Sequence, residues 1–375
     1  MAQQFQAPLK IALIAPLAEA VPPRLYGGTE RVVAHLADSL VDLGHAVTLF
    51  ASADARTSAR LVAVREQAIR LDPTPLKSDV AAHLALLHEV RRRADDFDVL
   101  HFHIDLLHFP FFEHLAARTL TTLHGRLDLA DLPDVYRRWP AYPLVSISDS
   151  QRRPLPSANW IATVHHGIPL DLFDYAPAHR GYLAFVGRIS PEKRPDRAIE
   201  VAQRAAVPLK LAAKVDLVDA AYFREVVAPL LKDPLVEFLG EIDDSAKNDF
   251  LGGARALIFP IDWPEPFGLV MIEAMACGTP VIAWDIASVP EIVEDGVTGF
   301  IVRSVDEAVT AVQRIDTLDR ARIRATFERR FSVATMSKNY LGLYSRLCRP
   351  AASARGVARG GSDDLAGDPD GALRA

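Results

Sequence analysis

The apolar residues of this chain form short runs separated by loops and by amphipathic stretches. Residues 10–15 are an apolar run, which predicts a buried strand. A loop rich in proline and glycine follows at 22–28, and Thr29 is expected to cap a helix that extends to about Leu43. Residues 47–51 predict a second strand. Strand, helix and strand in this order are typical of a parallel sheet.

The same alternation continues along the rest of the chain. Further strands are predicted at residues 99–102, 118–123 and 144–147, with a helix at about 79–94. After residue 169 the pattern starts again. The elements predicted there are strands at 182–186, 209–213, 236–239, 256–259 and 280–283, with helices at 195–206 and 267–276.

This pattern predicts an α/β protein of two doubly wound domains that face each other across a cleft. The N-terminal domain is expected at residues 1–170 and the C-terminal domain at 171–331. A helix at about 332–349 is a candidate to cross back to the first domain. Residues 351–375 are rich in Gly, Ala, Ser, Asp and Arg, which predicts a disordered tail. Ligands of such sheets bind beyond the carboxyl ends of the strands.

Length and composition narrow the classes of protein. A chain of 375 residues is too long for one ordinary core and suits two domains. Its formal net charge of −6 argues against a general nucleic-acid binder. Two cysteines indicate no disulfide framework, and no apolar run is long enough to cross a bilayer. We therefore expect a cytoplasmic protein, with weak membrane association left open and no prediction of oligomeric state.

The strongest local signal is a pair of glutamates, Glu265 and Glu273, separated by seven residues. Pro264 and Pro266 keep Glu265 out of helical geometry, and Pro266 suits the first position of a helix. Glu273 is then expected about two turns along that helix, a rise of about 12 Å. This spacing suits one carboxylate near a hexose and the other near a ribose. A pyrophosphate would lie between them, at the helix N-terminus.

Two cations follow the strand that is expected to end at Gly187. Arg188 can clamp a phosphate with two hydrogen bonds, and Lys193 can add a point charge. Cations at the carboxyl end of a strand suit a pyrophosphate leaving group, and they can take the place of a metal. Because no metal-ligand spacing occurs elsewhere, we predict neither a metal nor another cofactor.

Two further loops carry candidate residues. Gly27 and Gly28 allow a backbone to approach a ligand closely, although the spacing is not that of a dinucleotide-binding loop. His124 follows a strand and can bond a sugar hydroxyl or polarise the reacting centre. The other grouped histidines are interpreted as structural or as cleft lining, without a metal: His101, His103, His108, His165 and His166.

These segments together resemble the retaining family 4 glycosyltransferases of GT-B fold, also called glycosyl transferases group 1. The pair at 265–273 matches the family's E-x7-E motif, and residues 274–283, 289–291 and 295–300 resemble its usual continuation. The resemblance covers about residues 8–349. It implies two Rossmann-like domains, with the acceptor bound by the first and a nucleotide sugar by the second.

The resemblance also implies a role for each candidate residue. Arg188 and Lys193 would bind the donor diphosphate, and Glu273 would hold the ribose hydroxyls. Glu265 would contact the transferred sugar. The remaining implied contacts are Phe267, Gly268 and Leu269 at the phosphate and sugar, Gly27 and Gly28 opposite the pyrophosphate, His124 at the sugar, Ile242 at the nucleobase and Lys214 at the phosphates.

The implied reaction is a metal-independent transfer of a hexosyl unit with retention of anomeric configuration. UDP-sugars are the favoured donors, with GDP- and ADP-sugars open; the acceptor is a hydroxyl of a glycan, glycolipid or natural product. A nucleotide-sugar epimerase and a non-catalytic nucleotide-sugar-binding module are the alternatives. Two residues depart from the family pattern: Arg194 and Ala287 stand where glycine is common.

Overall fold

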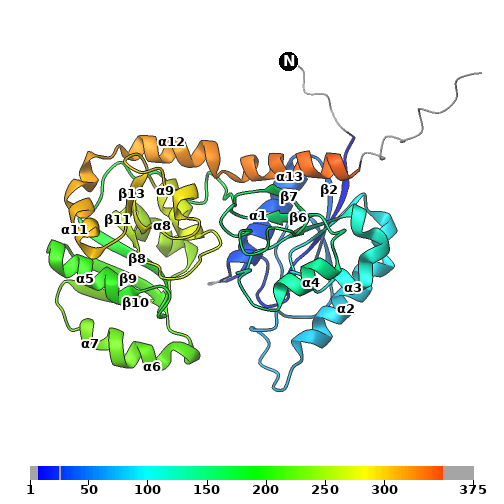
Figure 1. The fold of residues 1–375 in the computed structure, drawn as a ribbon, viewed down its shortest axis with the longest axis horizontal. Coiled ribbons are helices and arrows are strands. Elements are labelled where there is room, and N and C mark those ends of the chain that lie inside the picture. Colours follow the sequence, from blue (N-terminus) through cyan, green and yellow to red (C-terminus); the bar gives the residue numbers. More distant parts are fainter. Residues whose placement is uncertain (1–6, 25–26, 349–375) are drawn as a thin grey trace, which may run out of the picture.

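The computed structural model describes residues 7–24 and 27–348, which form two lobes side by side (Figure 1). The lobe near the N-terminus is built on a seven-stranded parallel sheet of order β3-β2-β1-β4-β5-β6-β7. Its strands are β1 (Lys10–Ile14), β2 (Ala46–Ala51), β3 (Arg60–Ala63), β4 (Val99–Phe102), β5 (Thr119–Thr122), β6 (Leu144–Ser146) and β7 (Trp160–Thr163). Its helices are α1 (Gly28–Asp42), α2 (Asp79–Arg92), α3 (Phe109–Phe112) and α4 (Leu132–Arg138).

The second lobe is built on a six-stranded parallel sheet of order β10-β9-β8-β11-β12-β13. Its strands are β8 (Tyr182–Arg188), β9 (Leu209–Lys214), β10 (Val236–Gly240), β11 (Ala254–Phe259), β12 (Val281–Trp284) and β13 (Gly299–Val302). Its helices are α5 (Pro195–Ala205), α6 (Ala220–Tyr222), α7 (Ala228–Leu230), α8 (Asp244–Gly252), α9 (Leu269–Ala276), α10 (Val289–Ile292), α11 (Val305–Arg314) and α12 (Arg320–Arg330). Two parallel sheets with helical connections confirm the predicted fold class.

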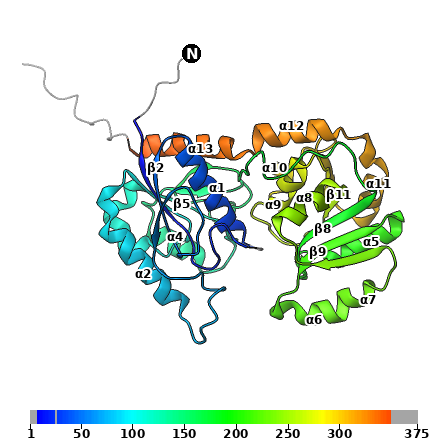
Figure 2. The ribbon, with the colours of Figure 1, turned by 180° about the vertical axis from the view of Figure 1, so that it is seen from behind.

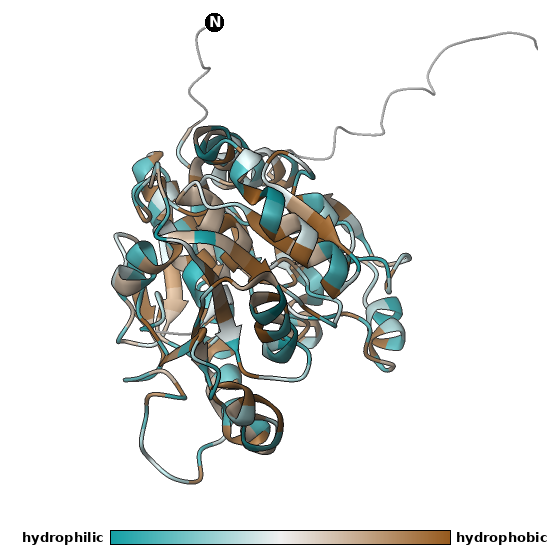
Figure 3. Cartoon of the chain, turned by 90° about the vertical axis from the view of Figure 1, so that its left-hand side faces the viewer, coloured by the Kyte–Doolittle hydropathy of each residue, from teal (hydrophilic) through white to brown (hydrophobic). Residues whose placement is uncertain are grey.

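Hydrophobic residues fill both faces of each sheet. In Figure 3 the strands are mostly brown, at the hydrophobic end of the scale, whereas the helices carry both colours. Strands buried on both faces are typical of parallel sheets that helices cover on each side. One core cluster lies on each face of each sheet.

Each sheet reverses its strand order once, and this reversal positions the site. In the first sheet the order turns between β1 and β4, and in the second between β8 and β11. The loops that follow strands at such a reversal diverge and leave a crevice between them. The loop after β1 carries Gly27 and leads to Gly28 at the start of α1, the loop after β8 carries Lys193, and the loop after β11 carries Glu265.

The chain passes between the lobes twice at one place. Ile168 and Ser332 form a parallel bridge, in which Ile168 N–H donates to Phe331 O and Val333 N–H donates to Ile168 O. Only glycine fits beside this bridge, because a Cβ at Gly167 would lie 2.4 Å from Ser332 O. Helix α13 (Val333–Leu347) then runs along the first lobe (Figures 1 and 2).

Side chains of α13 enter the core of the first lobe. Met336, Tyr340, Leu343 and Tyr344 belong to one of its hydrophobic clusters. Tyr344 Oη lies 2.8 Å from His101 Nδ1, which fixes the helix against β4. Helix α13, which follows the second lobe in the sequence, is therefore part of the first lobe. The predicted tail at residues 351–375 lies outside the described residues.

Three predictions about local structure are wrong. Helix α1 begins at Gly28 after Gly27, so Thr29 is not its cap. Strand β8 continues through Arg188 rather than ending at Gly187. Helix α9 begins at Leu269 rather than Pro266, because Gly268 has a left-handed backbone with φ 85° that a helix cannot contain. Glu273 therefore lies about one turn into the helix. The strands β3, β7 and β13 were not predicted.

Candidate active site

A cavity of about 670 Å³ opens between the two lobes, at the carboxyl ends of both sheets. Every candidate residue named from the sequence lines it. From the first lobe these are Gly27, Gly28 and His124; from the second they are Arg188, Lys193, Lys214, Ile242, Glu265, Phe267, Gly268, Leu269 and Glu273. The fold thus gathers residues up to 246 positions apart, from Gly27 to Glu273, around one space.

Glu265 and Lys193 form an ion pair inside this cavity. Lys193 Nζ donates to Glu265 Oε2, and both side chains are at most 15% exposed. The ammonium also lies 5.9 Å from the centre of the Phe259 ring. Because the pair is largely buried, each charge depends on the other or on a ligand. The sequence placed both residues in the site but did not predict that they pair.

Arg188 is held by carboxylates that sequence analysis missed. Its guanidinium bonds Glu192, and it lies 3.4 Å from Asp219 and 3.8 Å from Asp216. Lys214 Nζ lies 3.0 Å from Asp216 in turn. The cations expected at a diphosphate are therefore oriented by acidic neighbours. An incoming anion would have to replace these carboxylates as the partner of the two cations.

Glu273 is buried, with a side chain only 4% exposed. Lys247 Nζ lies 3.3 Å from its carboxylate oxygens and 3.3 Å from Asp244. Asp244 also bonds Arg31 of α1, in the other lobe. Burial alone would raise the pKa of Asp244, but the charges and hydrogen bonds of Arg31 and Lys247 hold it below its ordinary value. A line of alternating charges thus connects Glu273 to the first lobe.

The start of helix α9 faces the same cavity. No side chain caps this end of the helix, and Gly268, Leu269 and Val270 line the space. A Cβ on Gly268 would lie 2.7 Å from Met271 Cε. The positive φ and the lack of space for a side chain therefore both favour glycine at this position. A Cβ on Gly28 would lie 3.4 Å from Leu269 Cδ1. The two lobes therefore approach each other closely at the uncapped helix end.

His124 forms part of the opposite wall. Its Nε2 lies 2.9 Å from His103 Nδ1, and its ring stacks on His166 at 5.2 Å. Burial lowers the pKa of His124 to about 3. Within the described residues its Nδ1 has no hydrogen-bond partner. The imidazole is therefore neutral, which suits hydrogen bonding rather than charge stabilisation, and its Nδ1 is shielded from solvent.

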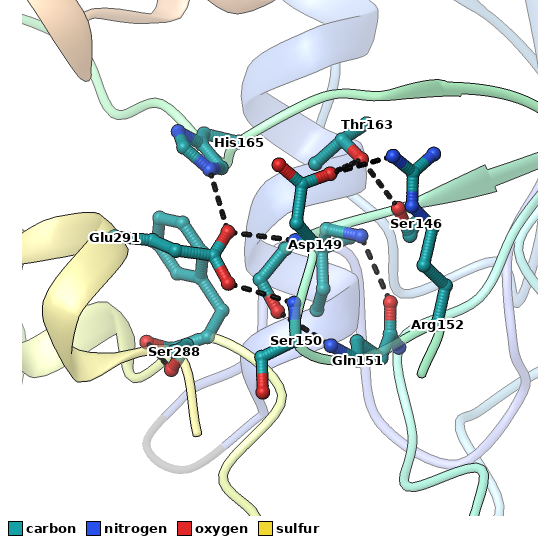
Figure 4. A network of polar contacts seen from close by, with 12 residues as sticks. Ser146, Asp149, Ser150, Gln151, Arg152, Thr163, His165, Ser288 and Glu291 are labelled. Atoms are coloured by element: carbon teal, nitrogen blue, oxygen red, sulfur yellow. Dashed lines mark hydrogen bonds and ion pairs between the residues drawn. The ribbon is translucent and has the colours of Figure 1, made fainter. Parts of the chain in front are cut away.

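A polar network joins the lobes beside the cavity (Figure 4). The carboxylate of Glu291, on α10, accepts hydrogen bonds from the backbone N–H groups of Asp149 at 2.6 Å and Ser150 at 2.7 Å. His165 Nε2 lies 3.5 Å from the same carboxylate. Nearby, Ser148 Oγ donates to Pro266 O at 2.7 Å. Sequence analysis quoted Glu291 in its motif but gave it no role.

The two departures from the glycine pattern keep the backbone shape of glycine. Arg194 and Ala287 each have φ of 53°, in the left-handed region. Arg194 precedes α5 and forms ion pairs with Asp196 and Asp262. The methyl group of Ala287 cannot form an ion pair. Both residues therefore adopt a conformation that glycine takes most easily, at the cost of backbone strain of about 1–2 kcal/mol each.

Residues 7–24 and 27–348 contain no group of three or more His, Cys, Asp or Glu side chains arranged to hold a metal ion. His101 and His108 instead bond Thr122 and Thr121. In the same part of the chain, no helix has both the length and the apolar character needed to cross a membrane.

Comparisons with known proteins agree with this architecture. The family model for Glycosyltransferase Family 4 matches residues 26–199, and that for Glycosyl transferases group 1 matches residues 175–326. A phosphatidyl-myo-inositol mannosyltransferase of Mycobacterium leprae is 27% identical over 90% of this chain and 96% of its own length. A D-inositol 3-phosphate glycosyltransferase of Mycolicibacterium smegmatis is 32% identical over 59% of this chain, but the match spans only 54% of that protein.

A solved structure is similar over nearly its whole length. AviGT4, a glycosyltransferase involved in avilamycin A biosynthesis, has a TM-score of 0.70 and 25% identity, with 91% of this chain and 98% of that chain covered. The two family models together span both sheets and the cavity between them. The chain therefore belongs to the family 4, group 1 glycosyltransferases and has their GT-B fold.

Proposed function

We propose that this glycosyltransferase moves a hexosyl unit from a nucleoside diphosphate sugar to a hydroxyl acceptor, with retention of configuration and without a metal. UDP-sugars are the favoured donors. The observation that carries the proposal is the composition of one cavity. A buried acid, a Lys–Glu pair and an uncapped helix end all line it, at the strand-order reversal of the second sheet.

The ribose is assigned to Glu273. A buried carboxylate needs hydrogen-bond donors, and Lys247 at 3.3 Å satisfies it only loosely. Two vicinal hydroxyls would complete its bonding, as they do for carboxylates that hold a ribose. Ile242 lines the cavity on the same lobe and offers an apolar surface to the base.

The diphosphate is assigned to Arg188, Lys193 and the start of α9. Unbonded N–H groups at a helix N-terminus attract an anion. Lys193 would turn from Glu265 toward the phosphate, while acidic neighbours keep Arg188 oriented. These groups favour the charge that grows on the departing phosphate, and so they stabilise the transition state more than the bound donor.

The sugar is assigned to Glu265 and His124, from opposite walls. The bond between the anomeric carbon and the β-phosphate oxygen breaks as the acceptor oxygen bonds the same face of that carbon. The departing phosphate oxygen takes the acceptor's proton, so no separate base is required. Since burial keeps His124 neutral, it contributes a hydrogen bond to a sugar hydroxyl.

The acceptor is assigned to the first lobe by position. The names of two relatives include inositol derivatives, and AviGT4 belongs to a natural-product pathway. These names have no single acceptor in common. We therefore keep the acceptor class at that level.

A thermal-shift screen against UDP-, GDP- and ADP-sugars, with and without EDTA, tests the proposal. A ligand at 100 times its Kd adds about 2.7 kcal/mol of stability. We expect one base to be selected, with the same shift in EDTA. Absence of a shift with every nucleotide sugar would contradict the donor site. Binding without transfer to any acceptor and without hydrolysis would instead favour a binding module.

A further inference from the structure

Trp263 lies on the loop between β11 and α9, two residues before Glu265, and lines the cavity. Its indole Nε1–H donates to Glu265 Oε2 at 2.9 Å. The backbone repeats the link, because Glu265 N–H donates to Trp263 O at 2.8 Å. The indole therefore holds the acid that is assigned to the transferred sugar.

We propose that Trp263 is a positioning residue that directs the Glu265 carboxylate toward the sugar of the donor. The inference rests on the proposed function. It adds a residue to which neither the motif nor the family comparison assigns a role.

The division of hydrogen bonds on Glu265 supports this role. Trp263 and Lys193 both donate to Oε2, whereas Oε1 accepts no hydrogen bond within the described residues. One oxygen is thus fixed by the protein, and the other is left for a hydroxyl. When Lys193 turns to a diphosphate, the uncharged indole is not attracted to that anion. Trp263 then remains to hold the carboxylate.

The indole ring is itself fixed from several sides. Lys193 Nζ lies 4.8 Å from the ring centre, and Arg126 of the first lobe lies 5.9 Å from it. Cations at these distances are attracted to the face of an indole. The preceding residue, Asp262, donates its N–H to Glu192 O at 2.8 Å. Its carboxylate also lies 3.0 Å from Arg194. The loop therefore cannot swing freely.

The test uses Trp263→Phe, which keeps an aromatic ring for the cations and removes the N–H donor together with part of the indole. Trp139→Phe is a matched control, because Trp139 Nε1 donates to Glu113 at 2.6 Å outside the cavity. For each protein, calorimetry measures the Kd of the nucleotide sugar that best stabilises wild type, and the Kd of its nucleoside diphosphate alone. Of the parts of the donor, the sugar is the one assigned to Glu265, so the ratio of the two constants is the readout.

We expect Trp263→Phe to weaken the nucleotide sugar about tenfold and the diphosphate less than twofold, as for one lost hydrogen bond to a charged group. Trp139→Phe should leave the ratio unchanged. In a Glu265→Ala background, Trp263→Phe should have no further effect on the ratio, because the two residues act as a unit.

Three results would overturn the inference. Equal weakening of both ligands, which leaves the ratio unchanged, would mean a general effect on the loop, and wild-type constants for both ligands would mean no effect on the sugar. An effect that persists in Glu265→Ala would mean that the indole contacts the sugar itself. Failure of wild type to bind any nucleotide sugar would remove the proposed function, and the inference with it. Binding measurements on wild type alone identify that failure and so distinguish it from failure of the inference about Trp263.

Discussion

The carboxylate of Glu291 in the second lobe accepts a hydrogen bond of 2.6 Å from the backbone N–H of Asp149 in the first lobe. A second bond, from Ser150 N–H, makes the contact bidentate. Burial alone would raise the pKa of Glu291, but these bonds and the nearby His165 outweigh it and hold the pKa below its ordinary value. The acid is therefore ionised and fixes one lobe to the other beside the cavity.

Glu291→Ala should loosen this junction. Loss of hydrogen bonds to a charged group costs about 2 kcal/mol, or a Tm lower by about 4–8 °C. Differential scanning calorimetry measures the change and also reports whether the two lobes begin to unfold separately. Glu294→Ala is the matched control, since that nearby carboxylate is exposed. Equal Tm values for the two variants would mean that the Glu291 contact does not hold the lobes together.

Sequence patterns predicted the fold class because buried strands and their connecting helices have periodic apolar residues. They also led us to expect Glu265 and Glu273 near each other, since prolines and an apolar helix constrain both locally, and both line one cavity. The start of that helix was predicted wrongly. Local pattern favoured Pro266, whereas the left-handed Gly268 sets the boundary, and one sequence does not reveal which glycines adopt positive φ.

The partners of the site residues were not predictable. Arg31 and Asp244 are 213 positions apart, and Lys193 and Glu265 are 72 apart. The first pair depends on how the two lobes are placed and the second on which strands are neighbours in one sheet, and no local periodicity records either arrangement. Trp263 was missed for a different reason. It adjoins the motif, but an aromatic residue near prolines is equally typical of plain packing.

Variants of the Lys193–Glu265 pair should separate binding from transfer. Glu265→Gln keeps the size of the side chain and should retain donor binding while losing transfer, because its charge acts on the reacting sugar. Lys193→Ala should weaken both, since the diphosphate loses a cation and a buried acid is left unpaired. Binding by calorimetry and turnover by nucleoside diphosphate release give the two quantities.

Lys210→Ala serves as the control for this pair. Lys210 also pairs with a glutamate, Glu237 at 2.8 Å, but neither residue lines the cavity. Its binding and turnover should match those of wild type. Wild-type turnover by Glu265→Gln would show that the proposed role of this carboxylate is wrong.

Glycine at the two left-handed positions should have opposite consequences. Ala287→Gly removes backbone strain of about 1–2 kcal/mol from the folded state. It also raises the chain entropy of the unfolded state, which costs about 0.5–1 kcal/mol. The free energy of unfolding should therefore rise by about 0.5–1 kcal/mol. Arg194→Gly also loses ion pairs to Asp196 and Asp262, and should be neutral or destabilising. Urea unfolding midpoints measure both. A lower midpoint for Ala287→Gly would contradict the assignment of strain.

Buried histidines should make the first lobe unstable in mild acid. Burial lowers the pKa of His124 to about 3 and places four others well below their ordinary value: His101, His103, His108 and His166. The unfolded chain takes up protons on these rings below about pH 6.5, whereas the folded chain does not. Stability is therefore fully present above pH 6.5 and falls as pH is lowered toward the folded pKa values. Each ring contributes up to about 1.4 kcal/mol per pH unit.

Urea unfolding between pH 7.5 and 5 measures this slope as protons taken up per molecule unfolded. His108→Phe should reduce the uptake by about one proton, because the histidine ring is buried and stacks on Phe102 at 3.8 Å. His88→Gln, which changes an exposed histidine, is the control variant. A stability that stays level from pH 7.5 to 5 in wild type would mean that these imidazoles are already protonated in the folded chain.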